Sequence, residues 1–356
     1  MSSVPYLLLV GKVTRIGALV TVLTNTLLIY LTYFHIKSIT GVYKVTIYLL
    51  AVFGILFSIV EFIAQPFVHF FDNSVMYFST DDMFGAPLPV KTGFLLAYSC
   101  LYATFLCLIA IQFFYRFCVI THSKMLALFE KKHYQWLMAY VTVCVGIWGA
   151  GSLKCLPDQF SMDYVKEELM KEYGSKVEET PGFFIVTYEL QNFTQHFHIP
   201  SLICALCCAY TLILQYSIII FCGLRIRSKM SEAKHHMSEK SHQMQRQLFR
   251  TLILQILTPS IFHHIPVLMM LLTVFLDVKF RIPFGIMFCF FSFFPAIDSG
   301  ILMVLVVEYR EIVKNFFKVV RDLWLRCHQD QRRVGEVTTR SFDLSRSNHV
   351  FSTTMT

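Results

Sequence analysis

Long apolar segments alternate with polar loops along this chain. The apolar segments cover residues 16–34, 45–71, 92–115, 134–153, 199–224, 251–276 and 282–307. Among Asp, Glu, Lys and Arg, the segments contain only Glu61 and Asp298. A transmembrane helix needs about 20 apolar residues, and a soluble fold could not cover so many helices that are apolar on every side. The pattern therefore predicts an all-α membrane protein, with a seven-transmembrane helix bundle in residues 1–307 and a tail in 308–356.

Basic residues are concentrated in every second loop. The loops on one side sum to a net charge of +13 and those on the other side to −3. The basic set is 35–44, 116–133, 225–250 and 308–356, and the other set is 1–15, 72–91, 154–198 and 277–281. Lys and Arg collect on the cytoplasmic side of membrane proteins, so we expect the N-terminus outside and the C-terminus in the cytoplasm. The overall charge of +8 then reflects topology, and we expect membrane lipids rather than nucleic acid as partners of the basic surface.

The loops and the tail carry three further signals. Residues 225–250 contain few helix breakers, so the fifth and sixth helices are expected to continue into the cytoplasm. Asn192 begins a glycosylation sequon close to the membrane, and it is either glycosylated or left unmodified. Residues 315–327 alternate apolar and basic positions, which predicts a helix on the inner leaflet. Cys327 at its end is a palmitoylation site or a plain cysteine. The Ser/Thr-rich end from Thr338 is predicted to be disordered and phosphorylatable.

The two carboxyl groups inside the apolar segments are the first candidates for function, because ionisable groups are costly in a bilayer. Counting about 1.5 Å per residue places Glu61 about 24 Å from the inner face and Asp298 about 14 Å from it. The two groups are therefore not expected to form a pair. Glu61 lies in the outer half, where a ligand could arrive, and Asp298 lies in the inner half, where helices rearrange for a cytoplasmic partner. The alternative for each is a structural hydrogen-bond anchor between helices.

Two adjacent histidines lie in the middle of the sixth apolar segment. His263 and His264 are flanked by Pro259 and Pro266, which permit bending of the sixth helix. Adjacent helical residues point about 100° apart, so at most one histidine fully faces the interior. No spacing supplies further ligands, so we expect no metal. The sequence also lacks nucleotide-binding and nucleophile motifs, so we expect neither an enzyme nor a cofactor.

Tyr115-Arg116 ends the third span at the inner face. Arg116 is either a topological anchor or the switch arginine that seven-helix receptors carry at this place. The usual acidic partner is absent, because Phe114 and Tyr115 precede the arginine.

Several longer motifs resemble those of the nematode Str-type seven-transmembrane chemoreceptors, a class that includes a receptor for the odorant diacetyl. They are Ile59-Val-Glu-Phe-Ile-Ala-Gln-Pro66, Gln247-Leu-Phe-Arg-Thr-Leu-Ile-Leu-Gln-Ile-Leu-Thr-Pro259, Phe275-Leu-Asp-Val278 and Phe294-Pro-Ala-Ile-Asp298. The resemblance covers essentially the whole chain. It implies a G-protein-coupled olfactory-type receptor in the plasma membrane of a sensory-neuron cilium. A heterotrimeric G protein and, at the phosphorylated tail, arrestin would be its protein partners.

Two departures from receptor patterns matter. The family often has Asp-Pro in the seventh span, where this chain has Asp298-Ser299. The disulfide that joins the third span to the second outer loop in rhodopsin-like receptors also lacks a clear partner, because Cys100 lies about eight residues inside the membrane. We therefore do not assign a bridge to Cys155.

The predicted ligand is a small, largely apolar odorant bound among the outer halves of the helices. Its candidate lining residues are Glu61, Gln65, Tyr98, Tyr102, and His263 or His264. The candidate signalling and G-protein contact residues are Tyr115, Arg116, Asp298, Arg225, Arg227, Arg246 and Arg250. The alternative function is a membrane transporter or ligand-gated channel, which would show polar faces on several spans and paired broken helices.

Overall fold

The computed structural model describes residues 4–36, 42–130, 133–191, 194–232, 239–275 and 285–315, together with residues 318, 321 and 324. Residues up to Val306 form one compact unit, and the residues from Val307 form a second. In the second unit, 307–315 are helical. Most of the predicted inner-leaflet helix, including Cys327, and the Ser/Thr-rich end lie outside the described residues.

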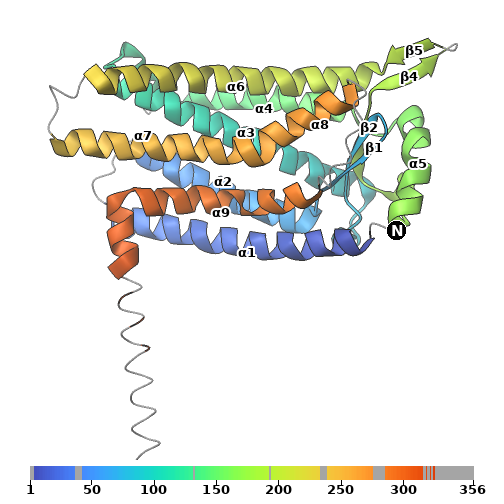
Figure 1. The fold of residues 1–356 in the computed structure, drawn as a ribbon, viewed down its shortest axis with the longest axis horizontal. Coiled ribbons are helices and arrows are strands. Elements are labelled where there is room, and N and C mark those ends of the chain that lie inside the picture. Colours follow the sequence, from blue (N-terminus) through green and yellow to red (C-terminus); the bar gives the residue numbers. More distant parts are fainter. Residues whose placement is uncertain are drawn as a thin grey trace, which may run out of the picture. The chain divides into compact units, whose positions relative to one another are not determined.

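The first unit is a bundle of long helices, which confirms the predicted fold class (Figure 1). Its long helical segments are α1 (Val4–Phe34), α2 (Val42–Ala64), α3 (Leu88–Ile120), α4 (Tyr134–Leu153), α6 (Ile199–Glu232), α7 (Glu239–Pro259) with η6 (Ser260–His264) and α8 (Ile265–Phe275), and α9 (Gly285–Leu305). Among the described residues, five helices are each long and apolar enough to cross a membrane, and a sixth is counted when the helical residues from Phe291 onward are taken together.

The sixth predicted span is broken in its middle. α7 ends at Pro259, a π-helical turn follows, and α8 resumes at Ile265. Proline lacks an N–H donor and clashes with the preceding turn, so a local π turn is a common response. The inner parts of α6 and α7 extend beyond the predicted spans, to Glu232 and from Glu239. The sequence prediction of a bent sixth helix with a helical inner extension therefore agrees with the structure.

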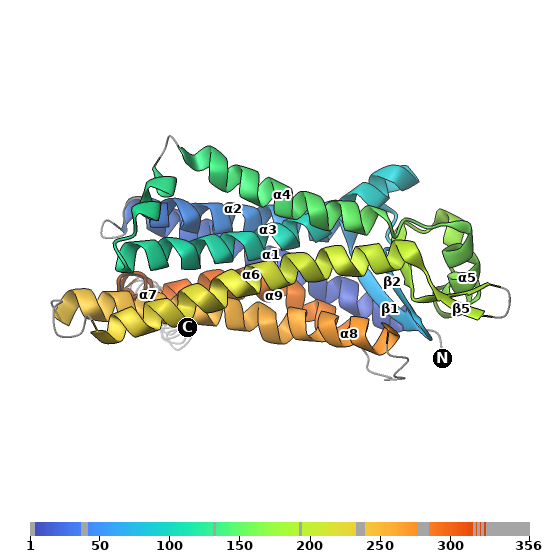
Figure 2. The ribbon, with the colours of Figure 1, turned by 90° about the horizontal axis from the view of Figure 1, so that it is seen from above.

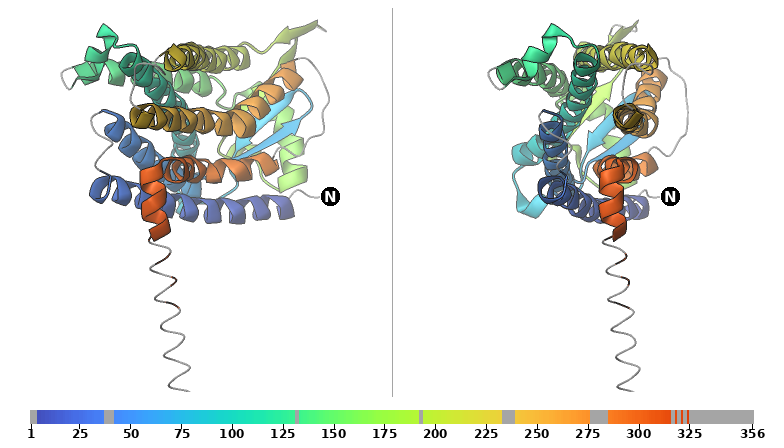
Figure 3. Two further views of the ribbon diagram at one scale, coloured as in Figure 1. Left: turned by 60° about the vertical axis from the view of Figure 1, so that its left-hand side comes forward. Right: turned by 90° about the vertical axis from the view of Figure 1, so that its left-hand side faces the viewer.

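α3 is the central helix of the bundle. It packs against α2, α4 and α6, while α1 packs against α2 and α9, and α7 packs against α9 (Figures 2 and 3). α1 and α9 approach closely where Gly17 faces Ser292, and a Cβ at Gly17 would lie only 2.6 Å from the Ser292 Cβ. Small residues permit such close helix contacts in membranes. Gly17 therefore sets the spacing of these two helices.

The predicted second span, 45–71, is wrong at its outer end. α2 stops at Ala64, Gln65 adopts a positive φ of 39°, and a strand begins at Phe67. Pro66 explains the break, because proline cannot continue the helical hydrogen bonds and disfavours helical backbone at the residue before it. The apolar composition of 67–71 hid this change, since a half-buried strand and a helix end can have the same residues.

A small antiparallel sheet lies at this end of the bundle, in the order β1 (Phe67–Phe71), β2 (Ser74–Phe78) and β3 (Gly182–Val186). Phe71 pairs with Ser74 across a two-residue turn, and Asp72 in that turn takes a φ of 47°. Aromatic and β-branched residues dominate all the strands and favour extended structure. α5 (Gln159–Tyr173) covers the sheet. We refer to residues 67–78 and 159–186 as the cap.

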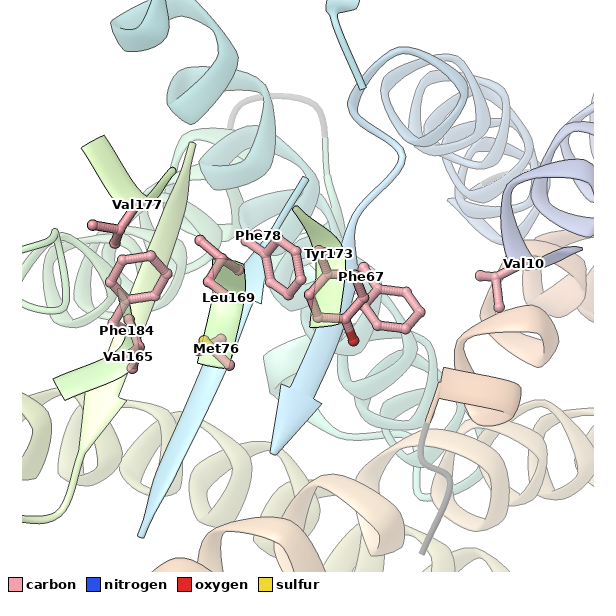
Figure 4. Close-up of a cluster of buried hydrophobic side chains, with 9 residues drawn as sticks. All are labelled: Val10, Phe67, Met76, Phe78, Val165, Leu169, Tyr173, Val177 and Phe184. Atoms are coloured by element: carbon pink, nitrogen blue, oxygen red, sulfur yellow. The ribbon is translucent and has the colours of Figure 1, made fainter. Parts of the chain in front are cut away.

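The cap has its own hydrophobic core between α5 and the sheet (Figure 4). The core residues are Val10, Phe67, Met76, Phe78, Val165, Leu169, Tyr173, Val177 and Phe184. A capping box between Asp158 and Ser161 begins α5, and Gly174 with a φ of 65° ends it. These devices satisfy helix-end hydrogen bonds, so the loop 154–198 is largely a folded element. A separate hairpin, β4 (Tyr188–Gln191) and β5 (Thr194–Phe197), follows.

Candidate functional site

A cavity of about 170 Å³ lies between the cap and the helices. α3, α4, α6, η6, α8 and all three cap strands contribute to its walls. The lining residues are Val68, Val75, Tyr77, Tyr98, Ser99, Tyr102, Trp148, Ser152, Cys155, Phe183, Ile185, Cys204, Cys208, Leu212, His264 and Val267. An apolar cavity of about 150 Å³ can hold benzene. This one therefore suits a small apolar molecule that uses a few hydroxyl groups for orientation.

Tyr102 is at the centre of the aromatic wall. Its ring centroid lies 5.4 Å from that of His264 and 5.7 Å from that of Trp148. The Trp148 indole N–H donates to the Ser99 hydroxyl at 2.7 Å, and the Tyr216 hydroxyl is hydrogen-bonded to His264 Nδ1. These contacts join α3, α4, α6 and η6 around the cavity. The aromatic wall is therefore held in place before any ligand binds.

The cap supplies the opposite wall. Tyr77 stacks on Phe183 with ring centroids 6.0 Å apart, and its hydroxyl donates to the Leu95 carbonyl of α3 at 3.0 Å. Burial raises the pKa of Tyr77 well above its ordinary value, so the hydroxyl remains a donor. Val75 of β2 packs against Phe291 of α9. The sheet is thus anchored to helices on two sides of the cavity.

Glu61 lies behind the cavity wall and is not among the residues that line it. Its side chain is buried, with 1% of its surface exposed. Its Oε1 accepts hydrogen bonds from the Tyr98 hydroxyl at 3.2 Å and from the Ser292 hydroxyl at 2.9 Å. Its Oε2 has no hydrogen-bond partner among the described residues. Glu61 therefore connects a cavity residue on α3 to α9.

Gln65 is also separated from this cavity. It lines a different crevice, together with Gly11, Lys12 and Arg15 of α1 and with Asp81. The cause is the break at Pro66, which turns the chain into the cap before Gln65 reaches the bundle interior. The structure therefore corrects the placement of Gln65 as a residue of the same pocket as Tyr98.

Polar contacts continue from this region along α1 and α9. Thr21 donates to the Ser292 carbonyl at 3.0 Å, and Ser299 donates to Asn25 Oδ1 at 2.7 Å. Asn25 Nδ2 in turn donates to the Thr21 carbonyl at 2.9 Å. All of these side chains are buried. Interhelical hydrogen bonds of this kind hold transmembrane helices in register.

Arg116 occupies the other end of the bundle. It is buried, with 6% exposure, although it carries a permanent charge. Its Nη1 donates to Gln245 Oε1 of α7 at 3.0 Å, and its guanidinium carbon lies 4.0 Å from the ring centroid of Tyr43 on α2. The missing neighbouring acid is thus replaced by an amide and an aromatic face. Both are recognised partners of guanidinium groups.

Asp298 lies close to this group. It is buried and lies near Gln255 of α7 and Tyr43 of α2. Its partners differ from those of Glu61, as the depth difference predicts. Asp298, Gln255, Tyr43, Arg116 and Gln245 together form what we call the inner cluster, which joins α2, α3, α7 and α9.

The remaining predicted signalling residues are spread over the same end. Tyr115 packs edge-on against Phe129 with ring centroids 5.0 Å apart. Arg225 is exposed and lies 5.7 Å from the ring centroid of Phe221. The other three arginines, Arg227, Arg246 and Arg250, line a second cavity between α6 and α7.

Three thiols line the first cavity. Cys155 and Cys204 are buried in one cluster, the half-buried Cys208 packs against that cluster, and each is a free cysteine. The thiol of Cys204, together with burial, raises the pKa of the Cys155 thiol well above its ordinary value. Cys155 is thus next to α6, and in this structure neither Cys155 nor Cys100 is part of a rhodopsin-type bridge.

Some predicted sites fall elsewhere. Asn192, Cys327 and the side chain of His263 lie outside the described residues. Within the described part of the chain, no group of three or more His, Cys, Asp or Glu side chains is placed to hold a metal ion.

The sequence prediction missed several residues that the structure brings to these sites. Tyr77 and Phe183 come from the cap, and Trp148 faces the cavity from α4. Gln245 and Gln255, the partners of Arg116 and Asp298, are uncharged and gave no signal of their own. The Asp158-x-x-Ser161 capping box and Gly174 were readable signals for α5. They would have indicated a folded element in the loop that carries Phe183.

Sequence comparisons identify relatives across almost the whole chain. Residues 11–314 match the family model described as "Serpentine type 7TM GPCR chemoreceptor Str". The chain is 33% identical to G-protein coupled receptor str-33 of Caenorhabditis elegans over 312 residues, which cover 86% of this chain and 90% of that protein. It is 26% identical to serpentine receptor class r-10 of the same organism, covering 89% and 93% of the two chains. These matches confirm the family predicted from the sequence motifs.

The fold has a counterpart among solved structures. The crystal structure of squid rhodopsin aligns with a TM-score of 0.56 at 16% sequence identity, covering 87% of this chain and 85% of that one. At this identity the likeness concerns the fold alone. It agrees with the helix-bundle fold described above. The family match and the curated relatives are receptors, so they support the receptor reading over the transporter or channel alternative.

Proposed function

The chain belongs to the Str family of serpentine seven-transmembrane G-protein-coupled chemoreceptors, and we propose that it binds a small odorant in the cavity beneath the cap and signals to a heterotrimeric G protein. The observation that carries this proposal is the cavity itself, which is apolar, lined by side chains from α3, α4, α6, η6 and α8, and covered on one side by the cap strands. The receptor is a multi-pass membrane protein and not an enzyme.

The size of the cavity limits the ligand class. A volume of about 170 Å³ accommodates a molecule about as large as benzene or somewhat larger, and it excludes peptides. The polar groups of the lining include the hydroxyls of Tyr98, Tyr102, Ser99 and Ser152 and the His264 ring, whereas the Tyr77 hydroxyl and the Trp148 N–H already have protein partners. The proposed ligand is therefore a small apolar molecule with one or two hydrogen-bonding atoms, such as a carbonyl or ether oxygen.

Ligand occupancy is proposed to reach α9 through Glu61. A ligand that displaces the Tyr98 ring changes the 3.2 Å hydrogen bond to Glu61, which also accepts from Ser292. The ligand need not contact Glu61 itself. A shift of this kind requires only that the ligand binds one arrangement of the helices better than another.

Coupling is proposed to begin at the inner cluster. While Arg116 is buried against Tyr43 and bonded to Gln245, it is not accessible to a partner. We therefore assign the described arrangement to the resting state. Movement of α7 would break the Gln245 contact and release Arg116, with Asp298 and Gln255 changing their contact in the same step. The G protein would then meet Tyr115, Arg116, Arg225, Arg227, Arg246 and Arg250.

The proposed orientation follows from charge. The loops with a net charge of +13 face the cytoplasm, and the cap, the N-terminus and the sequon at Asn192 face outward. Location in the plasma membrane of a sensory cilium, glycosylation at Asn192, lipidation at Cys327 and arrestin binding at a phosphorylated tail belong to the same proposal. An epitope tag at the N-terminus should label on intact cells, and a tag within 225–250 only after permeabilisation. The reverse labelling would contradict the orientation.

The ligand proposal is tested by filling the cavity. Cells that express the receptor with a second-messenger reporter are screened with small volatile carbonyl, ether and alcohol compounds. Cys208→Phe puts an aromatic ring into the cavity and should abolish the response to an active compound. Leu206→Phe is the matched control, because Leu206 is 60% exposed on the outer face of the same helix and should leave the response unchanged.

Surface expression of both variants is measured alongside. A Cys208→Phe receptor that reaches the surface and responds like the original would exclude this cavity as the ligand site. Loss of the response in both variants would show a general effect on α6 and would not support the cavity.

A further inference from the structure

A second and larger cavity, of about 870 Å³, lies between α6 and α7 in the half of the bundle away from the cap. We call it the α6–α7 groove. Its walls contain apolar residues along their length, and Arg227, Arg246 and Arg250 lie at one end. Ile220 and Leu224 of α6 and Leu257 of α7 are 57%, 64% and 45% exposed. Exposed apolar side chains on membrane-spanning helices face hydrocarbon, so the groove is open to the lipid.

The arginines of the groove have no acidic partner among the described residues. Arg246 and Arg250 are four residues apart and therefore lie on the same face of α7, and Arg227 joins them from α6. Lys229, only two residues from Arg227, is instead paired with Glu232 at 2.6 Å. The apolar groove therefore has three positive charges at one end, and none of them is paired with an acidic side chain in the part of the chain that the structure describes.

The length of the groove matches one leaflet. From Arg227 to Tyr216 at its far end, α6 rises about 16 Å at 1.5 Å per residue. Half of a hydrocarbon core about 30 Å thick is about 15 Å. Cationic groups at the headgroup level and apolar walls below it are the complement of a phospholipid. In the proposed orientation they face the inner leaflet, which carries the anionic lipids.

The middle of the groove has room for a lipid acyl chain. Gly223 lines it, and an added Cβ there would touch only the Phe113 ring, at 3.6 Å and beyond. Phe113 itself is fully buried in the cluster that holds α3, α6 and α7 together. The absence of a side chain at Gly223 therefore leaves the middle of the groove open, although the helices are packed beneath it.

We propose that the α6–α7 groove binds one anionic phospholipid from the surrounding leaflet. The phosphate and the headgroup carboxylate or phosphates contact Arg227, Arg246 and Arg250, and an acyl chain lies over Gly223 along α6 and α7. The site is independent of the odorant cavity and requires no ligand there. It uses the groove arginines in the described arrangement, before α7 moves to admit a G protein.

The test uses the full-length receptor in nanodiscs with equal amounts of phosphatidylserine and phosphatidylcholine, followed by native mass spectrometry of the lipids that stay bound. Receptor orientation does not matter in a nanodisc, so this test does not depend on the topology. The original receptor should retain phosphatidylserine preferentially. Each of Arg227→Gln and Arg250→Gln should lower that preference about fivefold, the effect of one arginine near an anionic surface. Arg225→Gln removes the same charge from the same helix outside the groove and should have no effect.

A second variant tests the shape of the site. Gly223→Leu keeps every charge and fills the groove floor, so it should reduce retention of both lipids. Equal phosphatidylserine retention by the original and the arginine variants would overturn the proposal. Competition by soluble glycerophosphoserine at the lipid's own concentration would overturn it too, since the acyl chain would then contribute nothing. So would arginine variants that keep the lipid and lose only G-protein activation, because the arginines would then serve the G protein alone.

Discussion

Removing the Gln245 side chain is expected to raise receptor activity in the absence of ligand. Gln245 Oε1 accepts the 3.0 Å hydrogen bond that ties α7 to Arg116. A hydrogen bond to a charged group contributes about 1.5–3 kcal/mol, and the lower value applies because this contact is only partly buried. A loss of about 1.5 kcal/mol changes an equilibrium between two states about 13-fold. A receptor that is about 1% active at rest would then be about 11% active.

The assay measures G-protein activation without ligand in Gln245→Ala cells, normalised to the amount of receptor at the surface. Gln247→Ala is the matched control, because it shortens a nearby glutamine on the same helix without touching Arg116. Basal activity should rise only in the Gln245 variant. An unchanged basal level, or a fall in maximal activity at equal surface expression, would refute the assignment of the described arrangement to the resting state.

Further predictions concern the carboxyl groups, the cap and the helix spacing. Glu61→Gln keeps most of the hydrogen bonds and should shift the ligand dose–response while the maximal output is preserved. Asp298→Asn should instead change the basal or maximal output. A change in ligand selectivity in the Asp298→Asn receptor would contradict this division. Burial lowers the pKa of His69 below its ordinary 6.5, and this effect is larger than the opposite effect of a nearby carboxylate of α5, which raises the pKa. The folded cap therefore takes up fewer protons than the unfolded one, and its stability should fall as pH drops below about 6.5. Hydrogen exchange in β1 and α5 should show this loss, and His69→Gln should weaken it. Gly17→Val should lower the free energy of unfolding of the purified receptor by about 1–3 kcal/mol through overpacking. Gly93→Val should not lower it, because the space around a Cβ at Gly93 is open.

The sequence predicted the bundle because each transmembrane helix carries its own signal. The length of an apolar run is a local property, and bilayer thickness fixes how long it must be. The prolines around His263 and His264 predicted the bend of the sixth helix in the same way. The sequence also predicted that Glu61 and Asp298 lie at different depths in the membrane. The depth of a residue follows from its position along its own helix and does not depend on the neighbouring helices.

The partners of these residues could not be predicted, because they depend on which helix faces meet. Nothing near Glu61 in the sequence indicates Ser292, which is 231 residues away. Gln245 is 129 residues from Arg116 and carries no charge to mark it as a partner. The cap was hidden for another reason: residues 67–71 are as apolar as a helix end, and only Pro66 marks the change to a strand.

The division of the odorant cavity between cap and bundle has a consequence for how such receptors diversify. Val75, Tyr77 and Phe183 stand on strands that belong to loops, and they take no part in the inner cluster. Loops tolerate substitution better than the elements they connect. A duplicated gene could therefore acquire a new odorant by changes in these strands, while α3, α7 and α9 keep the contacts that transmit the signal. In this architecture, changes in odorant selectivity and the preservation of G-protein signalling depend on different parts of the chain.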